Sequence, residues 1–149
     1  MTIGLLIFLP LYSIKPAYAE EELCLARSIY FEARGEAEIG QIAVGNVILN
    51  RVSDSRYPNS ICGVTRQGYK ENRKDCQFSW YCDGNSDIMY EGENKSLALT
   101  LAKNLIKGKI TDITEGATHY HATSVNPRWA KSLTKVHQIG DHIFYRWDK

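Results

Sequence analysis

The sequence predicts one α+β domain in which helices come first and a small antiparallel sheet comes late. Apolar residues recur with helical spacing as far as residue 107, whereas the chain from Ala117 onward is rich in aromatic and β-branched residues. The 149 residues suffice for one ordinary core, and no internal repeat or low-complexity tract divides them. With 44% hydrophobic and 23% charged residues, the composition excludes an intrinsically disordered chain.

The first 19 residues are predicted to be a secretory signal peptide. Ile3–Ile14 is a short, uncharged apolar run, and Ala17-Tyr18-Ala19 forms a small-x-small cleavage site before three glutamates. No Lys or Arg precedes the run, so an uncleaved anchor is the alternative. We therefore expect residues 20–149 to form the domain, and we expect the protein to be exported to the periplasm or cell envelope.

The expected mature chain has no net charge. The sequence holds 18 basic and 17 acidic side chains, and Lys15 is the only charged side chain among the first 19 residues. Nucleic-acid binding depends on an excess of Lys and Arg. Nucleic acid is therefore not an expected partner.

The predicted first helix runs from Glu20 to about Arg34. Three acidic residues suit a helix start, where the macrodipole is positive, and Gly35 is expected to end the helix in a left-handed conformation. A second helix is predicted over Ile39–Val52, followed by a loop over Ser53–Asp75. A third helix is predicted over Ser96–Lys107, with Leu97, Leu101 and Leu105 facing inward and Gly108 just after its end. The last predicted element is a hairpin of Thr134–Ile139 and His142–Trp147 around Gly140-Asp141.

Glu32 is the first candidate for catalysis. Leu25, Ile29 and Glu32 are spaced i, i+4 and i+7, so they share one face of the first helix. A carboxyl group on an apolar face loses hydration, which raises its pKa and lets it act as the general acid that cleaves a glycosidic bond. The alternative is a glutamate that turns to solvent or pairs with Arg34 or Arg51.

The second candidate is the segment Gln77-Phe78-Ser79-Trp80. Its amide, hydroxyl and aromatic groups suit a sugar, which offers hydroxyls for hydrogen bonds and apolar ring faces for stacking. The alternative is a loop held by a disulfide, with its aromatic side chains in the core. In an exported chain, Cys24, Cys62, Cys76 and Cys82 suggest two disulfides, with three possible pairings.

Two histidines raise the questions of a metal and of a nucleophilic cysteine. His119 and His121 point to the same side if they lie on a strand, but a zinc site needs three or four ligands and no HExxH motif is present. We therefore expect neither a metal nor another cofactor. A Cys–His hydrolase using Cys24 is the rival enzyme class, weakened by the acidic residues beside Cys24 and by the even number of cysteines.

Several motifs, in order, resemble the SleB-type cell-wall hydrolases, the family of the spore cortex-lytic enzymes. The resemblance extends over about Leu23–Tyr145 and is carried by Tyr30–Glu36, Gly40–Val44, Val47–Val52, Cys76–Trp80 with Cys82–Gly84, and Thr118–His121 with Pro127 and Trp129. It implies a lysozyme-like fold and action on the glycan strands of peptidoglycan. We expect the protein to be a monomer.

The resemblance also implies a mechanism, that of a lytic transglycosylase. By motif position Glu32 is the acid and then the base, and the 6-hydroxyl of N-acetylmuramic acid closes a 1,6-anhydro ring. Glu36 is the candidate for a supporting or second carboxylate. The same matching assigns Gln77, Ser79, Tyr120 and His121 to the substrate groove. A hydrolase that uses water on the same bond and a non-catalytic wall-binding protein are the remaining alternatives.

Overall fold

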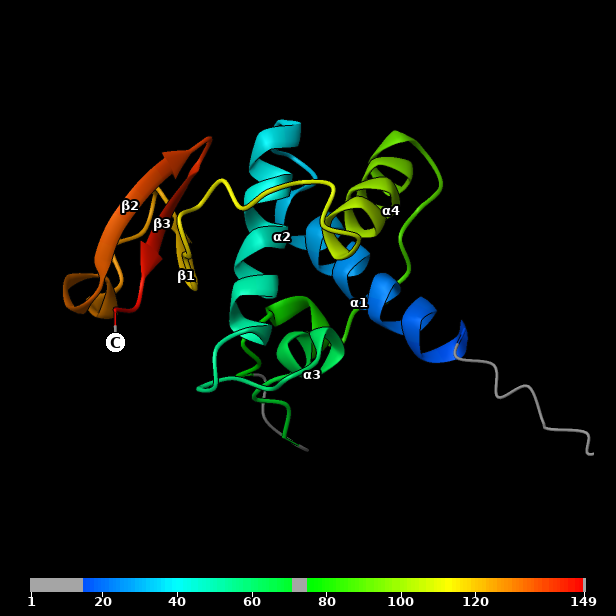
Figure 1. The fold of residues 1–149 in the computed structure, drawn as a ribbon, viewed down its shortest axis with the longest axis horizontal. Coiled ribbons are helices and arrows are strands. Elements are labelled where there is room, and N and C mark those ends of the chain that lie inside the picture. Colours follow the sequence, from blue (N-terminus) through cyan, green and yellow to red (C-terminus); the bar gives the residue numbers. More distant parts are fainter. Residues whose placement is uncertain (1–14, 71–74, 149) are drawn as a thin grey trace, which may run out of the picture.

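The computed structural model describes residues 15–70 and 75–148, and it has a helical part followed by a three-stranded sheet (Figure 1). This confirms the predicted order of elements. They are α1 (Lys15–Ala33), α2 (Glu38–Val52), α3 (Ile61–Thr65), the 3₁₀ helix η1 (Ser79–Tyr81), α4 (Glu93–Ile106), β1 (His119–Ala122), the 3₁₀ helix η2 (Arg128–Ser132), β2 (Thr134–Ile139) and β3 (His142–Arg146).

The first helix differs from its prediction at both ends. It begins at Lys15 and not near Glu20, because Pro16 is tolerated in a first turn and the following alanines favour helix. It ends at Ala33, and Gly35 does not adopt the predicted positive φ, because the Glu36 N–H donates to the Ala33 carbonyl (2.9 Å) and closes an ordinary turn.

The helix is therefore continuous through the predicted cleavage point after Ala19. The apolar run Ile3–Ile14 lies outside the described residues, so signal-peptide cleavage stays a prediction. Within residues 15–70 and 75–148, no helix is long and apolar enough to cross a membrane.

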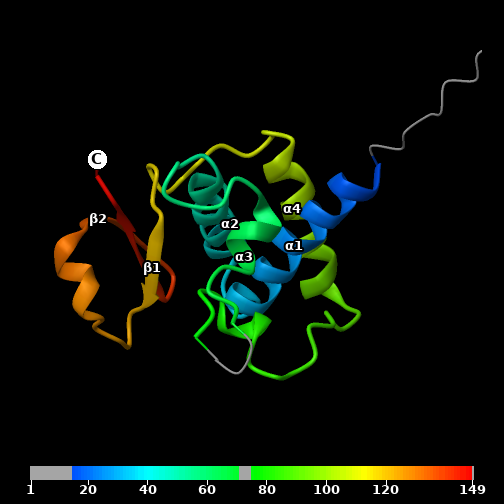
Figure 2. The same ribbon diagram turned by 90° about the horizontal axis from the view of Figure 1, so that it is seen from below.

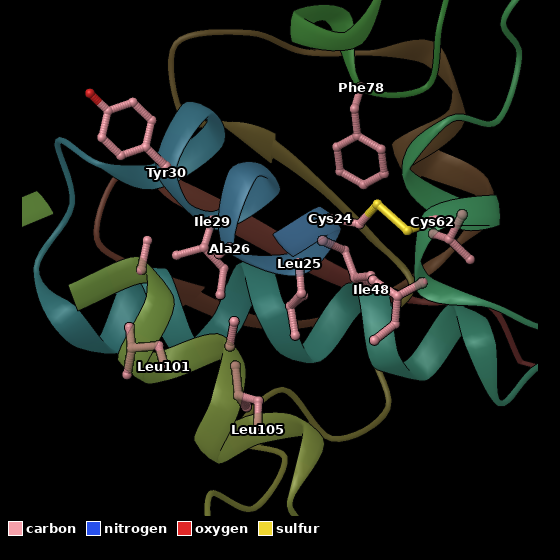
Figure 3. Packing of buried hydrophobic residues seen from close by; sticks show 14 of the residues in the cluster. Cys24, Leu25, Ala26, Ile29, Tyr30, Ile48, Cys62, Phe78, Leu101 and Leu105 are labelled. Carbon is pink, nitrogen blue, oxygen red and sulfur yellow. A yellow bond between two sulfur atoms is a disulfide. The ribbon is translucent and has the colours of Figure 1, made fainter. Parts of the chain in front are cut away.

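The main core lies where α1 packs against α2 and α4 (Figure 3). Leu25 and Ile29 are fully buried there, as their spacing predicts. The helices approach closely at Gly45 of α2, where a Cβ atom would lie only 2.5 Å from Leu105 Cδ1. The inner stripe of α4 includes the predicted Leu101 and Leu105, whereas Leu97 is only half-buried.

The predicted loop after α2 contains a short helix, α3, that was not predicted. Ser60 caps its first turn by accepting a hydrogen bond from the Gly63 N–H (3.0 Å), and this N-cap serine was the available sequence signal. A disulfide between Cys24 and Cys62 joins α3 to α1. The second disulfide joins Cys76 and Cys82, so the structure selects one of the three pairings.

The sheet has the strand order β1-β3-β2, and β2 and β3 form the predicted hairpin. Tyr120 of β1 is paired with Phe144 of β3, and both belong to the cluster that packs on Ala43 and Val47 of α2. We call this side the inner face. The opposite, outer face lies toward η2, on the far side of the sheet from α2 (Figure 2).

Candidate active site

Glu32 lies in the last turn of α1, at the junction of the helices with the inner face of the sheet. Its side chain is half-buried, and the Tyr120 hydroxyl donates a hydrogen bond to Glu32 Oε2 (2.8 Å). These residues are 88 positions apart, and packing of the sheet on α2 brings them together. The two predicted site residues therefore form one constellation.

Burial dominates the electrostatics of this pair. It raises the pKa of Glu32, while the hydrogen bond from Tyr120 and the charge of Arg51 act in the opposite direction. Burial and the nearby Glu32 also raise the pKa of Tyr120 well above its usual range, so the phenol stays protonated as a donor. Glu32 thus retains its proton to a higher pH than an exposed glutamate, as a general acid requires.

Arg51, which the sequence suggested only as an alternative pairing partner for Glu32, is a buried residue close to the candidate site. The structure buries it at 3% exposure, where its Nε donates to the Thr118 carbonyl at the start of β1 (2.7 Å). Its guanidinium lies over the rings of Tyr57 and Phe78 (5.3 and 5.5 Å to the ring centroids). Arg51 therefore fixes β1 against α2, and an arginine within an apolar helix was the sequence signal.

Two asparagines of α2 were also missed, and they hold the segment that leads into β1. Asn50 Nδ2 donates to the Ala117 carbonyl (2.9 Å) and to Asp112 Oδ2 (3.0 Å). Asn46 Oδ1 accepts from the Ile113 N–H (3.1 Å). Because Tyr120 follows directly, these bonds help to set its position opposite Glu32.

Glu36 contacts the turn of the β2–β3 hairpin. Its carboxylate accepts from the Asp141 N–H (3.2 Å) and lies 3.5 Å from His142 Nδ1. Gly140 permits this approach, because its φ is +55° and a Cβ atom there would lie 2.0 Å from Glu36 Oε2. The His142 ring in turn packs edge-on against Tyr120, with centroids 5.1 Å apart. Glu36 thus supports the hairpin behind the Tyr120–Glu32 pair.

Gln77 and Ser79 lie on the loop closed by the Cys76–Cys82 disulfide. Both are exposed. The loop is anchored by buried Trp80, which stacks on Phe31 (5.4 Å between centroids, 20° between planes). Phe31 precedes Glu32 in the chain, so this contact fixes the loop to the last turn of α1.

His121 lies on the outer face, opposite to Tyr120, so the structure does not place it beside Glu32. Its Nε2 is 2.9 Å from the Tyr145 hydroxyl, and its ring packs against Trp129 of η2. His119 shares this face, as the alternation along a strand predicts, and packs against Trp129 and Trp147. Among the described residues, no three His, Cys, Asp or Glu side chains form a metal-binding group.

We expect His119 to make stability depend on pH. Burial, with Arg51 and Arg56 nearby, lowers the pKa of His119 to about 4 from its ordinary 6.5. Between these values the unfolded chain binds a proton that the folded chain does not, so the free energy of unfolding decreases as the pH falls from about 6.5 to 4. Urea unfolding of the parent and of His119→Gln at several pH values tests this.

His119→Gln should show a smaller decrease in the free energy of unfolding as the pH falls. Part of the decrease should remain, because burial also lowers the pKa of His142. An unchanged slope in His119→Gln would contradict the assignment.

The Cys–His hydrolase alternative is wrong. Cys24 is 4% exposed and is bonded to Cys62, and no described cysteine is free. A thiolate nucleophile is therefore not available at Cys24.

Known proteins resemble this chain along most of its length. A family model described as "Cell Wall Hydrolase" matches residues 35–145, a range that begins just after Glu32 and includes Glu36. The spore cortex-lytic enzyme of Halalkalibacterium halodurans is 31% identical over 134 residues, which cover 89% of this chain and 37% of that protein. The corresponding enzyme of Bacillus subtilis is 34% identical over 122 residues, covering 80% and 35%. The chain spans a third to a half of the length of the curated relatives it matches.

Solved structures show the same fold. The catalytic domain of the germination-specific lytic transglycosylase SleB from Bacillus anthracis superposes with a TM-score of 0.68 at 28% identity, covering 93% of this chain and all of that one. The SleB catalytic domain of Bacillus cereus gives 0.61 at 29% identity, covering 85% and 91%. The α+β, lysozyme-like prediction is thus confirmed. The family match over most of the chain and these superpositions together show that the chain belongs to the cell wall hydrolase family.

Proposed function

We propose that the protein cleaves the glycan strands of peptidoglycan at N-acetylmuramic acid, as a lytic transglycosylase. One observation carries the proposal: Glu32 is half-buried, with a raised pKa, and is held by Tyr120 where the helices meet the sheet. Membership of the cell wall hydrolase family and the likeness to a domain described as a lytic transglycosylase support it.

The proposed reaction needs one carboxyl group. Protonated Glu32 donates its proton to the oxygen of the glycosidic bond as that bond breaks and positive charge develops at C1 of N-acetylmuramic acid. The Glu32 carboxylate then takes the proton of the 6-hydroxyl of the same sugar, whose oxygen bonds to C1 and closes the 1,6-anhydro ring. Glu32 ends protonated, and no water is consumed.

The other predicted residues take supporting roles in this proposal. Tyr120 orients the Glu32 carboxyl group, and Glu36 steadies the hairpin through Asp141 and His142. Gln77 and Ser79 offer polar groups to the sugar beside α1. His121 would contact the glycan only on the outer face, where its ring packs against Trp129. We also propose that the protein is a monomer that acts in the periplasm or cell envelope, without a metal.

Product analysis tests the reaction type. Purified peptidoglycan sacculi digested with the protein should release muropeptides with 1,6-anhydro ends, which mass spectrometry distinguishes from reducing ends by one water molecule. Reducing ends would show instead that water attacks C1, and the protein would then be a hydrolytic muramidase. A digest with the Glu32→Gln protein serves as the control for contaminating activity.

Tyr120→Phe should change both the rate and its dependence on pH. The variant loses a hydrogen bond to a charged group, which corresponds to a decrease in kcat/KM of about 10-fold or more. Because that bond stabilises the ionised carboxylate, its loss raises the pKa of Glu32, and the alkaline limb of the pH profile should move to higher pH. Turbidity clearance of sacculi between pH 4 and 9 measures both effects.

Tyr145→Phe is the matched control, since its hydroxyl lies on the outer face beside His121. It should leave the alkaline limb in place. A limb in Tyr120→Phe that stays fixed or moves to lower pH would contradict the role given to Tyr120.

A further inference from the structure

A pocket of about 380 Å³ opens at the carboxyl end of α1, and two of its lining residues, Phe31 and Arg34, flank the candidate acid in the chain. Phe31 of α1, Arg34 just after the end of that helix, and Trp80 line it. Phe31 and Glu32 are consecutive residues, so their Cα atoms are only about 3.8 Å apart. The mechanism proposed above makes no use of this pocket, whose remaining lining residues are Asp83, Asn85, Ser86, Asp87 and Tyr90.

The pocket contains charges of both signs. The Arg34 guanidinium lies over the rings of Tyr30 and Phe31 (5.0 and 5.9 Å to the centroids). A guanidinium has five N–H donors, so one that lies over an aromatic ring can still bind a carboxylate. Asp83 and Asp87 contribute carboxyl groups to the same pocket. A ligand with both acidic and amino or amide groups matches these charges better than a neutral sugar does.

Aromatic rings also line the pocket. Trp80 is 7% exposed and its ring stacks on that of Phe31, with 5.4 Å between the centroids. The exposed ring of Tyr90 adds an apolar surface at the edge of the pocket. The pocket therefore combines charged groups with aromatic walls.

We propose that this pocket binds the stem peptide that N-acetylmuramic acid carries, with Arg34 on a peptide carboxylate and Asp87 on a peptide amine or amide N–H. The inference rests on the proposed function, in which the bond cleaved belongs to this sugar. The stem peptide is attached to that same sugar, so cleavage beside Glu32 places the peptide near the adjoining wall of α1. The pocket then makes the enzyme prefer peptide-bearing glycan to bare glycan.

The test compares two forms of one substrate. Intact sacculi and sacculi stripped of their stem peptides by an amidase are digested by the parent and by Arg34→Gln, and the preference is the ratio of kcat/KM on the two forms. We expect the parent to prefer intact sacculi and Arg34→Gln to reduce this preference about 10-fold, mainly through KM, as for a lost hydrogen bond to a charged group. Asp87→Asn should reduce it in the same direction.

Arg128→Gln is the matched control, because it removes the same charge from an exposed arginine on η2, at the outer face of the sheet. It should retain the parental preference. Equal losses by Arg34→Gln on both substrates would show that the pocket holds sugar, and a parent without preference would also overturn the proposal.

Failure of the proposed function gives a different pattern, in which the parent cleaves neither substrate. The pocket is then tested by titrating a free synthetic stem peptide into the Glu32→Gln protein and into the Glu32→Gln/Arg34→Gln protein by calorimetry. Binding that weakens about 10-fold with the second substitution supports the pocket. Absence of binding, or equal binding by both proteins, overturns it.

Discussion

Glu32→Gln is expected to abolish clearance of peptidoglycan, with a decrease in rate of about 10²–10⁴-fold. The amide has nearly the shape of the carboxyl group, and its oxygen can still accept the hydrogen bond from Tyr120. It has no acidic proton to give to the glycosidic oxygen, and it cannot act as a base toward the 6-hydroxyl. The rate of turbidity loss of purified sacculi measures the effect.

The same substitution should not weaken the fold at neutral pH. The pKa of Glu32 is higher in the folded protein than in the unfolded chain, so the folded state binds more protons between the two values. Its contribution to stability is full below the unfolded pKa and is lost as the pH rises through the folded pKa. A neutral glutamine avoids that loss. Urea unfolding at pH 7 should therefore give Glu32→Gln at least the parental free energy of unfolding.

Glu93→Gln provides the matched control for this experiment. Glu93 is an exposed glutamate in the first turn of α4, where the change should cost a few tenths of a kcal/mol at most and leave the rate unchanged. If Glu32→Gln clears the wall as fast as the parent does, Glu32 is not the acid. If the parent binds sacculi but neither protein clears them, the protein is a wall-binding protein without catalysis.

The second large effect concerns the Cys24–Cys62 disulfide. Its cysteines are 38 positions apart, and loop-closure entropy predicts that losing the cross-link costs about 4 kcal/mol. The Cys76–Cys82 disulfide closes a separation of only 6 positions, for which the same relation gives about 2 kcal/mol. The double variant Cys24→Ser/Cys62→Ser should therefore unfold at a markedly lower urea concentration than Cys76→Ser/Cys82→Ser.

Activity separates this structural role from a chemical one. At a temperature where the Cys24→Ser/Cys62→Ser protein is still folded by circular dichroism, it should clear sacculi at close to the parental rate, because neither sulfur belongs to the Glu32 site. Loss of clearance by the folded variant would contradict a purely structural disulfide. Equal urea midpoints for the two double variants would contradict the estimate from loop length.

Local patterns in the sequence determined much of the fold. The spacing of Leu25, Ile29 and Glu32 placed the candidate acid on the buried face of α1, because helical periodicity depends only on near neighbours. The hairpin around Gly140-Asp141 was predicted for the same reason, since residues adjacent in sequence form the turn. The boundaries of α1 were less well determined, because both helix ends depend on weak local preferences.

Only the tertiary structure decided which distant groups meet Glu32. Tyr120 reaches it across 88 positions because β1 packs its inner face on α2, whereas His121, one residue later, points to the other face. The burial of Arg51 against the start of β1 depends on the same packing. Sequence alone shows the alternation along a strand, but it does not show which face of the strand is turned toward the helices. That choice is made by the long-range burial of Phe144 and its neighbours, and it determines the surroundings of the acid.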